Sequence, residues 1–349
     1  MAEMREDLSK SPQPTRGVAR DDVLSTLLSA MRLSGSLQFC FMPSGAWQTD
    51  DKPSLAALSG KASGTVPFHI VVAGQCWLKI EGDEATLNAG DVLIFPFGTG
   101  HQLGAGAGGV LVEPMRELPP KPWRQIPVLR HGDEADGVRL LCGYLQCDAL
   151  SFEPLRKALP KLIHVKTLGA NGGDWLRATI RQMVDEVDRP RAGGISMLPR
   201  LTEMIFIEIL RHQIMMAEPR SVGWLAALAD EALSRCLSII HDDPTHDWSL
   251  KELSITCGMS RSVLAERFKT ILGTSPIRYM RDWRLYLASV SLATTGAPIA
   301  AIAYEAGYAT EAAFSRAFSR AFGTPPATWR TEAQNSHAAL GQRPPCSTP

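Results

Sequence analysis

The sequence predicts an α+β protein with two domains, in which a β-rich N-terminal domain precedes an all-helical C-terminal domain. The chain has 349 residues, which is longer than one ordinary compact core. Short apolar runs separated by Gly and Pro fill residues 34–114, as expected of strands joined by turns. After about Leu155 the pattern changes to long stretches with few helix breakers, which is typical of helices.

The composition describes a soluble globular protein, with 45% apolar and 21% charged residues. The first ten residues, MAEMREDLSK, are charged where a signal peptide needs an apolar run, and no apolar stretch is long enough to span a bilayer. The seven cysteines are irregularly spaced and include no CxxC pair, which favours structural thiols in a reducing compartment. We therefore expect a cytoplasmic protein that makes no membrane insertion.

Charge is unevenly distributed along the chain. Residues 248–330 carry ten Lys or Arg and five Asp or Glu, a surplus of five positive charges. Because the whole chain has 36 residues of each sign, the remainder has a surplus of five negative charges. One basic segment on an acidic body is the asymmetry expected when a single domain meets phosphates.

The N-terminal domain is expected to span residues 21–220. Residues 1–20 are polar and contain Pro, and we expect them to be disordered. Strand-length segments rich in β-branched and aromatic residues cover 68–72, 76–80 and 92–95, with turn residues at 82–83 and 88–91. These segments predict a small β-sandwich or barrel.

Three helices are expected beyond the strands, over residues 174–188, 195–216 and 224–240. The second is apolar around most of its circumference, so it is buried either against its own domain or at a dimer seam, and the sequence does not separate the two. Residues 332–349 are expected to form a disordered tail.

Residues 248–270 predict two helices joined by a tight turn. Ser249 is expected to cap the first helix over 250–256, with Glu252 completing a capping box. Gly258 supplies the positive φ that a sharp turn requires, and Ser260 caps the second helix. This second helix has an expected buried stripe of Leu264, Phe268 and Ile271, an exposed face of Ser262, Glu266 and Lys269, and a stop at Gly273. The arrangement is that of a helix-turn-helix unit.

A second copy follows about 50 residues later in the same register. Its helices are expected over 298–306 and 310–322, with Gly307 at the turn. Core positions, stops and following residues correspond between the copies: Leu264 with Phe314, Phe268 with Phe318, Gly273 with Gly323, Pro276 with Pro326 and Tyr279 with Trp329. Such a repeat strengthens the helix-turn-helix interpretation beyond what either copy supports alone.

Residues 276–293, between the copies, predict one long helix with Ser275 as N-cap and Pro276 in the first turn. About 18 residues span roughly 27 Å, somewhat less than the roughly 34 Å of one DNA turn. Both recognition helices can then enter successive major grooves, with some bending of the duplex. A helical interaction domain without DNA is the alternative, and the basic surplus argues against it.

Residues 222–331 resemble the DNA-binding domain of the AraC family of transcription regulators, including the Gly-Thr-Ser-Pro and Gly-Thr-Pro-Pro-Ala-Thr-Trp-Arg segments that follow the two units. The resemblance implies that exposed residues early in each recognition helix contact bases, namely Ser262, Ala265 and Glu266 in the first unit and Ala312, Ala313 and Arg316 in the second. Arg316 suits bidentate pairing with guanine, whereas Glu266 departs from the basic or amide residues common in the family and either accepts from cytosine or faces water. Arg261, Lys269 and Arg320 are the expected phosphate contacts.

The N-terminal domain resembles a cupin. Gly90-x5-Pro96-x-Gly98-x2-His101 follows the second cupin motif and His69-x-Val71-x3-Gln75-x6-Gly82 the frame of the first. Metal-binding cupins place His and Glu where this chain has Val71 and Gln75, so we expect no metal and no cofactor, with His69 and His101 hydrogen-bonded in the barrel. An organic ligand at the barrel mouth is expected instead, with a lining drawn from Trp47, His69, Gln75, Trp77, Phe95, Phe97 and His101.

These patterns favour a sequence-specific DNA-binding transcription regulator of the AraC type that responds to a small organic ligand and is not an enzyme. Its expected partners are promoter DNA, a small-molecule effector, a second copy of the chain and RNA polymerase. Two alternatives stay open: a metal-dependent cupin enzyme with an accessory DNA-binding tail, and a ligand-independent regulator whose cupin only dimerises.

Overall fold

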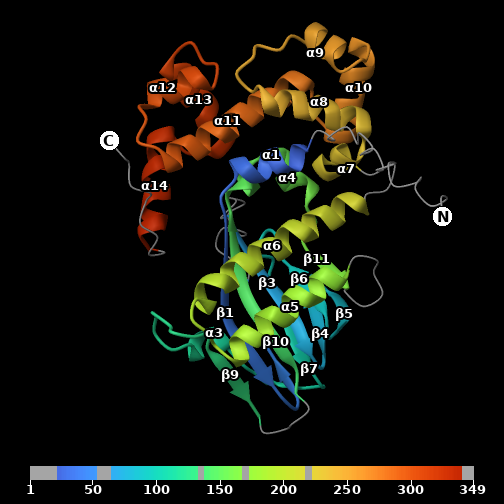
Figure 1. The fold of residues 1–349 in the computed structure, drawn as a ribbon, viewed down its shortest axis with the longest axis vertical. Helices are drawn as coiled ribbons and strands as arrows, with labels where there is room; N and C mark the ends of the chain where they lie inside the picture. The colour runs from blue at the N-terminus through green and yellow to red at the C-terminus, as the bar shows by residue number, and fades with distance from the viewer. Residues whose placement is uncertain (1–21, 53–63, 133–136, 167–172, 217–221, 340–349) are drawn as a thin grey trace, which may run out of the picture.

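A computed structural model describes residues 22–52, 64–132, 137–166, 173–216 and 222–339, and the predicted disordered segment 1–20 lies outside these residues. A β-rich domain forms one half of the molecule and a helical domain the other (Figure 1). The predicted α+β class with two kinds of domain is therefore confirmed. None of the described helices combines the length and apolar character that crossing a bilayer requires.

Two sheets form the β-rich domain. The larger has the order β11-β6-β3-β10-β1-β9 and the smaller the order β5-β4-β7-β2-β8. The larger contains β1 Leu33–Pro43, β3 Thr65–Ala73, β6 Asp91–Ile94, β9 Val128–His131, β10 Arg139–Cys147 and β11 Ile163–Lys166. The smaller contains β2 Trp47–Gln48, β4 Gln75–Ile80, β5 Asp83–Asn88, β7 Gln102–Ala105 and β8 Val110–Leu111. The predicted strands 68–72, 76–80 and 92–95 correspond to β3, β4 and β6.

The apolar faces of the two sheets meet in a core that includes Phe41, Trp47, Leu78 and Phe95. Strand alternation produces this core, because successive side chains of a strand point to opposite faces. On β4, for example, Cys76 and Leu78 are buried while Gln75 and Lys79 are exposed. A packed space between two sheets is the environment in which a small-ligand cavity can form.

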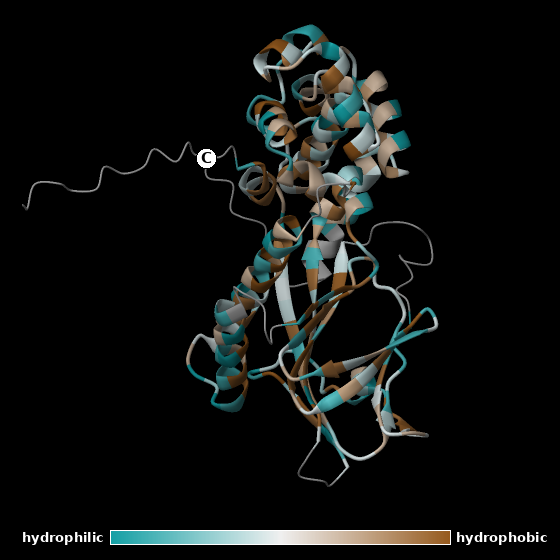
Figure 2. Ribbon diagram, turned by 90° about the vertical axis from the view of Figure 1, so that its right-hand side faces the viewer, coloured by the Kyte–Doolittle hydropathy of each residue, from teal (hydrophilic) through white to brown (hydrophobic). Residues whose placement is uncertain are grey.

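Helices cover the outer face of the larger sheet (Figure 2). These are α5 Gly173–Asp188 and α6 Gly194–Met215, and α6 lies directly on β1. The approach is close at Gly35 of β1, where a Cβ atom would come within 2.5 Å of the Pro199 carbonyl oxygen. The apolar stripe predicted for residues 195–216 therefore packs within its own domain, although Met204 and Met215 remain 45% and 78% exposed.

The shorter helices of this half are α1 Val23–Ala30, α3 Pro114–Glu117, the 3-10 turn η1 Asp148–Ser151 and α4 Glu153–Ala158. Helix α1 packs on the helical domain, and η1 and α4 contact it as well. The two domains are therefore joined by direct packing in addition to the chain connection.

The helical domain contains α7 Trp224–Ala229, α8 Glu231–Asp242, α9 Leu250–Thr256, α10 Arg261–Leu272, α11 Pro276–Thr294, α12 Ile299–Glu305, α13 Glu311–Phe322 and α14 Pro326–Ala339. The prediction of one helix over 224–240 is wrong, because Asp230 leaves the helical conformation and caps α8 by accepting the Leu233 N–H. The chain also stays helical beyond Thr331, so a disordered tail from residue 332 does not describe residues 332–339.

Two of the six cysteines in the described part of the chain depart from the expectation of structural thiols. Cys236 of α8 and Cys257 at the end of α9 form a disulfide, which corrects the expectation that these residues are thiols. The two lie side by side in the core of the first helix-turn-helix unit, which the spacing in sequence does not reveal. Cys40, Cys76, Cys142 and Cys147 are buried thiols, as expected.

Candidate DNA interface and ligand cavity

The first helix-turn-helix unit consists of α9 and α10. Ser249 and Ser260 cap these helices by accepting the N–H groups of Glu252 and Val263. The Glu252 carboxylate bonds to His246 at 2.8 Å, so the predicted capping box is not completed. Gly258 has a φ of 68°, as the turn between the helices requires. Leu264 and Phe268 are fully buried, which fixes the face that α10 presents outward.

The second unit repeats this construction in α12 and α13. Thr310 caps α13 by accepting the N–H of Ala313, and Gly307 has a φ of 82° at the turn. Phe314 and Phe318 are fully buried at the positions that correspond to Leu264 and Phe268. The two recognition helices thus expose equivalent faces, as the repeat in the sequence predicts.

Helix α11 connects the two units as one unbroken helix of 19 residues (Figure 1). At its first end the Tyr279 ring packs edge-on against Phe268 at 5.9 Å. At its other end the Ser289 carbonyl oxygen accepts from the Trp329 indole N–H at 3.1 Å. Both recognition helices are therefore anchored to one rigid element.

The residues expected at DNA lie on the open faces of α10 and α13. Ser262, Glu266, Ala312 and Arg316 are exposed, and Ala265 and Ala313 are half-buried. The expected phosphate contacts Arg261, Lys269 and Arg320 are exposed as well. Glu266 accepts a hydrogen bond from Thr270 on its own helix at 3.2 Å. Solvent can reach every position that the resemblance assigned to DNA.

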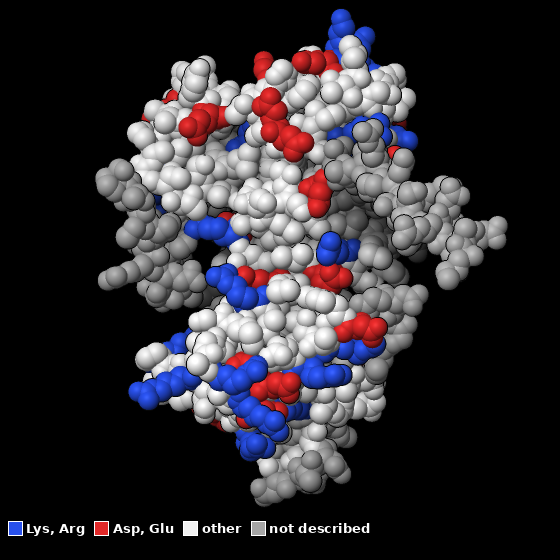
Figure 3. Space-filling model, viewed as in Figure 1, with Lys and Arg blue, Asp and Glu red and all other residues white. Residues whose placement is uncertain are grey.

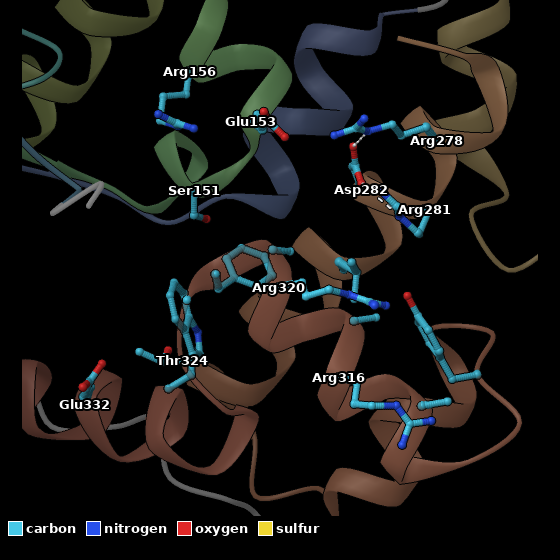
Figure 4. Close-up of a pocket in the computed structure, with 18 residues that line it drawn as sticks. Ser151, Glu153, Arg156, Arg278, Arg281, Asp282, Arg316, Arg320, Thr324 and Glu332 are labelled. Carbon is cyan, nitrogen blue, oxygen red and sulfur yellow. Dashed lines mark hydrogen bonds and ion pairs between the residues drawn. The ribbon is translucent and has the colours of Figure 1, made fainter. Parts of the chain in front are cut away.

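A cleft of about 1020 Å³ lies between α4, α11 and α13, and five arginines line it: Arg156, Arg278, Arg281, Arg316 and Arg320. Figure 4 shows Arg278 and Arg281 held by Asp282, with Glu153 pointing toward Arg278 from the other wall. By contrast, acidic side chains gather in the middle of the helical-domain face seen in Figure 3. The cleft beside α13 therefore has five arginines and three acidic residues, Glu153, Asp282 and Glu332, in its lining.

A second cavity of about 230 Å³ lies inside the barrel, with apolar walls from Phe39, Phe41, Leu103 and Leu140. Polar groups reach it from Gln38, Thr49, His69, His101 and Tyr144. A cleft of about 760 Å³ opens next to it and shares Asp51, Lys52, Thr99 and His101 with it. The cavity thus combines an apolar interior with a few polar groups and an opening toward solvent.

The structure brings together only part of the predicted ligand lining. His69 and His101 line the inner cavity, and Phe97 lines the outer cleft with His101. Phe95 lies behind His101, stacked on it at 3.7 Å. Trp47 lies one layer further back, edge-on against the cavity residue Phe41 at 5.5 Å.

Gln75 and Trp77 do not lie in the wall of the cavity, which corrects the predicted lining. Gln75 is exposed and donates to Asn88, and the Trp77 indole N–H donates to the Gly106 carbonyl. Both residues alternate with Cys76 and Leu78, which take the inward positions of β4, so the pleat of the strand turns them outward.

His69 and His101 face each other, with 2.9 Å between their Nε2 atoms. Asp51 completes a cluster with them, its carboxylate lying 3.7 Å from Nε2 of His101. Burial lowers the pKa of His69 well below its usual value, and His101 adds to the effect. Burial also lowers the pKa of His101, against the opposing influence of Asp51, whose own pKa is raised by burial. Both imidazoles are therefore neutral at neutral pH.

Comparison with known proteins supports both halves of this description. Residues 22–215 match a family described as Cupin, and residues 253–332 match a family described as Helix-turn-helix domain. A putative AraC-like transcription regulator of Streptomyces antibioticus is 30% identical over 320 residues, which cover 89% of this chain and 97% of that protein. The chain belongs to the AraC-like transcription regulators.

Other relatives agree with this membership. The HTH-type transcriptional regulator AlkR of Acinetobacter baylyi is 28% identical over 326 residues, covering 89% of this chain and 99% of that protein. Among solved structures, ToxT from Vibrio cholerae O395 aligns with 87% of this chain and 98% of its own at 11% identity, but its TM-score of 0.34 is too low to support any argument. The protein is thus an AraC-type DNA-binding transcription regulator with a cupin domain.

In this AraC-like regulator the two domains meet at Phe152, which the sequence did not single out. Phe152 is 1% exposed and inserts among Trp224, Tyr279, Trp283 and Tyr286 of the helical domain, with ring centroids 5.4–6.4 Å away. Phe152 directly follows η1, and η1 directly follows β10, which lines the inner cavity. A single short segment therefore connects the cavity wall with the DNA-binding domain.

A polar contact accompanies this aromatic one. Asp148 of η1 accepts hydrogen bonds from the Tyr286 hydroxyl at 3.3 Å and from the Arg32 N–H at 2.8 Å. Sequence reasoning also missed Asp51, Arg278 and Arg281. The abundance of aromatic residues in α11 was the one available signal for the domain contact, and residue 51 lies outside both cupin motifs.

Proposed function

We propose that this regulator changes its DNA occupancy when a small organic molecule binds in the cavity inside the barrel. The observation that carries the proposal is the inner cavity itself, with its apolar walls and its few converging polar groups. Its 230 Å³ lies below the roughly 300–1,000 Å³ typical of drug-sized ligands, which favours a metabolite-sized effector.

The exposed faces of α10 and α13 are the proposed DNA-reading surfaces. Ser262, Ala265 and Glu266 on α10, and Ala312, Ala313 and Arg316 on α13, are the proposed base contacts, and Arg261, Lys269 and Arg320 the proposed phosphate contacts. Their exposure at the first turns of two equivalent helices supports these roles. Arginine is the residue best suited to bidentate recognition of guanine, so Arg316 is the strongest single candidate.

Strand β10 and Phe152 form the proposed route between ligand and DNA. Leu140 and Tyr144 of β10 line the cavity, and the same strand continues through Asp148 to Phe152. A ligand that displaces β10 changes how Phe152 fits among the rings of α7 and α11. Because α11 carries both recognition helices, such a change alters the geometry offered to DNA. Coupling between two sites of this kind is typically about 5–150-fold in affinity.

The test combines ligand binding and DNA binding on the full chain. Thermal denaturation across a panel of small organic acids, amines and aromatic metabolites is expected to identify a compound that raises Tm. In Leu140→Phe, which narrows the cavity, the shift is expected to disappear. In Phe152→Ala the thermal shift is expected to persist while the compound no longer changes DNA affinity. A panel without any shift contradicts the proposal and favours a regulator that responds to no ligand.

A homodimer, a contact with RNA polymerase and action in the cytoplasm complete the proposal. Met204 and Met215 leave apolar surface on the outer side of α6, which supports association of two copies there. Sedimentation of the wild type and of Met204→Lys tests this: a dimer that Met204→Lys dissociates supports the interface, and a monomer at all concentrations contradicts it.

A further inference from the structure

The side chains of Asp51, His69 and His101 converge from three separate segments, the residues after β2, strand β3 and the residues before β7. We infer that these three residues form a binding site for a divalent transition-metal ion. This inference does not depend on an organic effector, and it adds Asp51, which lies outside both cupin motifs, to the two motif histidines.

The distances between the side-chain atoms suit one shared ion. Zinc binds imidazole nitrogen and carboxylate oxygen at about 2.0–2.2 Å, so two ligand atoms on a tetrahedral ion lie roughly 3.3–3.5 Å apart. The Nε2 atoms of His69 and His101 are 2.9 Å apart, and His101 Nε2 is 3.7 Å from the Asp51 carboxylate. One separation is shorter and the other longer than this value, and all three ligand atoms lie within 4.8 Å of one another, so binding an ion requires the side chains to adjust their positions.

The surrounding hydrogen bonds orient both imidazoles toward a common point. Nδ1 of His101 lies 2.9 Å from the Thr99 carbonyl oxygen, and because a carbonyl only accepts, this nitrogen carries the proton. The Nε2 lone pair of neutral His101 is then free to bind a metal. Nδ1 of His69 lies 3.1 Å from the Cys142 sulfur, which can accept a hydrogen bond from a protonated Nδ1. Metal-binding histidines are held by outer partners of this kind.

Asp51 is placed beside His101 by the backbone. The N–H of each residue donates to the carbonyl oxygen of the other at 2.9 Å. This bridge supplies the carboxylate that the first cupin motif lacks, because Val71 is buried in the core and Gln75 is exposed on β4. Two imidazoles and one carboxylate suit zinc or iron(II). They do not suit magnesium or calcium, which prefer oxygen ligands.

The site is reachable and keeps room for further ligands. Asp51 and His101 line both the outer cleft and the inner cavity, and the Asp51 side chain is 41% exposed. An ion can therefore enter from the cleft, and its remaining coordination positions can hold water on the cavity side. This combination of ligands, outer partners and access is what distinguishes a metal site from a buried pair of histidines.

Equilibrium dialysis of the untagged full chain tests the inference. The protein is stripped with a chelator, dialysed against zinc and, in parallel, against iron(II) under anaerobic conditions, and its metal content is measured by mass spectrometry. About one ion per chain is expected in the wild type. Asp51→Asn and His101→Gln are expected to lower the affinity at least tenfold, and Cys142→Ala about tenfold through the loss of an outer partner.

Asp50→Asn is the matched control, because Asp50 is the exposed neighbour of Asp51 and accepts from Gln102 outside the cluster. It is expected to retain the ion. Circular dichroism shows whether each variant is folded, and the half-exposed Asp51 keeps the test informative if a buried histidine variant fails to fold. Absence of metal from the wild type, or equal loss in Asp50→Asn and Asp51→Asn, overturns the inference.

Discussion

The two helix-turn-helix units of this regulator are built alike but are supported differently. In the first unit, Leu264 and Phe268 belong to a core that continues through Tyr279 and Trp283 into the barrel domain. In the second, Phe314 and Phe318 belong to a separate small core that also contains Leu285 and Leu292 of α11. The first unit is therefore part of one packed body with the cupin domain, whereas the second is held by α11 and α14.

This difference shows that a repeated local sequence pattern does not determine how a unit is coupled to the rest of a protein. Caps, turns and buried stripes are equivalent in the two units, because short-range chemistry sets them. The packing against the cupin domain involves Phe152 and residues of α7 and α8, and α7 contacts α10 of the first unit. We expect the first unit to follow the state of the cupin domain directly and the second to follow it through α11.

The largest expected contrast comes from truncating the equivalent core rings. Phe268→Ala and Phe318→Ala should each cost about 3–5 kcal/mol of local stability, because each leaves a large cavity. Phe268→Ala is expected to lower the main unfolding transition of the whole chain, and Phe318→Ala to unfold α12 and α13 separately. Hydrogen exchange checks this, and equal loss of protection in α10 and α13 of Phe318→Ala would show that the units are not independent.

Acid is expected to affect the two units unequally. Burial lowers the pKa of His241 to about 3, and its ring stacks on Trp283 at 3.9 Å beside the first unit. The unfolded histidine titrates near 6.5, so between these values only the unfolded chain takes up the proton. Stability contributed by neutral His241 is therefore complete above about pH 6.5 and falls by about 1.4 kcal/mol per pH unit below it.

The second unit has no histidine between residues 299 and 331, so this source of acid sensitivity is missing there. Hydrogen exchange at pH 7 and pH 5 is expected to show faster opening of α8 and α10 and little change in α13. His241→Gln is expected to flatten the dependence around the first unit. Burial also lowers the pKa of His69, so the barrel is expected to lose stability in acid as well. The two helix-turn-helix units are therefore compared with each other and not with the barrel. A pH profile unchanged in His241→Gln would rule out this cause.

DNA recognition provides the next contrast. Arg316→Ala should lose about 1–3 kcal/mol of discrimination at one base position, because the proposed bidentate contact to guanine is removed. Arg320→Ala should weaken binding to all sequences alike and reduce the salt slope by about one, because one proposed phosphate contact is lost. Binding to a randomised duplex library at several salt concentrations measures both. Identical behaviour of the two variants would contradict the assigned roles.

The smallest effects are expected at the helix caps. Ser260→Ala and Thr310→Ala each remove one side-chain acceptor at the start of a recognition helix and should each cost about 1 kcal/mol. Because the second unit has less surrounding structure, Thr310→Ala is expected to reduce DNA affinity more than Ser260→Ala. Denaturant unfolding and DNA titration test the two variants. A larger loss of DNA affinity in Ser260→Ala than in Thr310→Ala would contradict the inference that the second unit is less well supported by its surroundings.

Much of the fold could be predicted because local chemistry fixes it. The strands β3, β4 and β6, the caps at Ser249, Ser260 and Ser275, and the glycine turns all lie where the sequence places them. The break at Asp230 was missed because the segment from Trp224 to Ile240 has no Gly or Pro, although an aspartate is a strong cap. The inner face of β4 was misassigned because a motif fixes spacing but not which face of a strand points inward.

The candidate site was less predictable, because its parts are distant in sequence. His69 and His101 were found through motifs, whereas Asp51 reaches them only through the backbone bridge that the fold creates. Phe152 lies in an ordinary turn and acquires its importance from the rings that surround it in three dimensions. Pairings across 30 or more residues leave no periodic signal in one sequence.

Helix α11 has one further consequence, which concerns the operator. As an unbroken helix of 19 residues it holds the two recognition helices in a fixed rotational phase as well as at a fixed separation. A B-DNA turn contains about 10–10.5 base pairs, so inserting five base pairs between the two subsites would turn one of them to the far side of the duplex. Ten inserted base pairs would return both subsites to the same side of the duplex, but the distance between them would then be too large for α11 to span. Operators of this regulator should therefore tolerate changes of base identity between their subsites far better than changes of length.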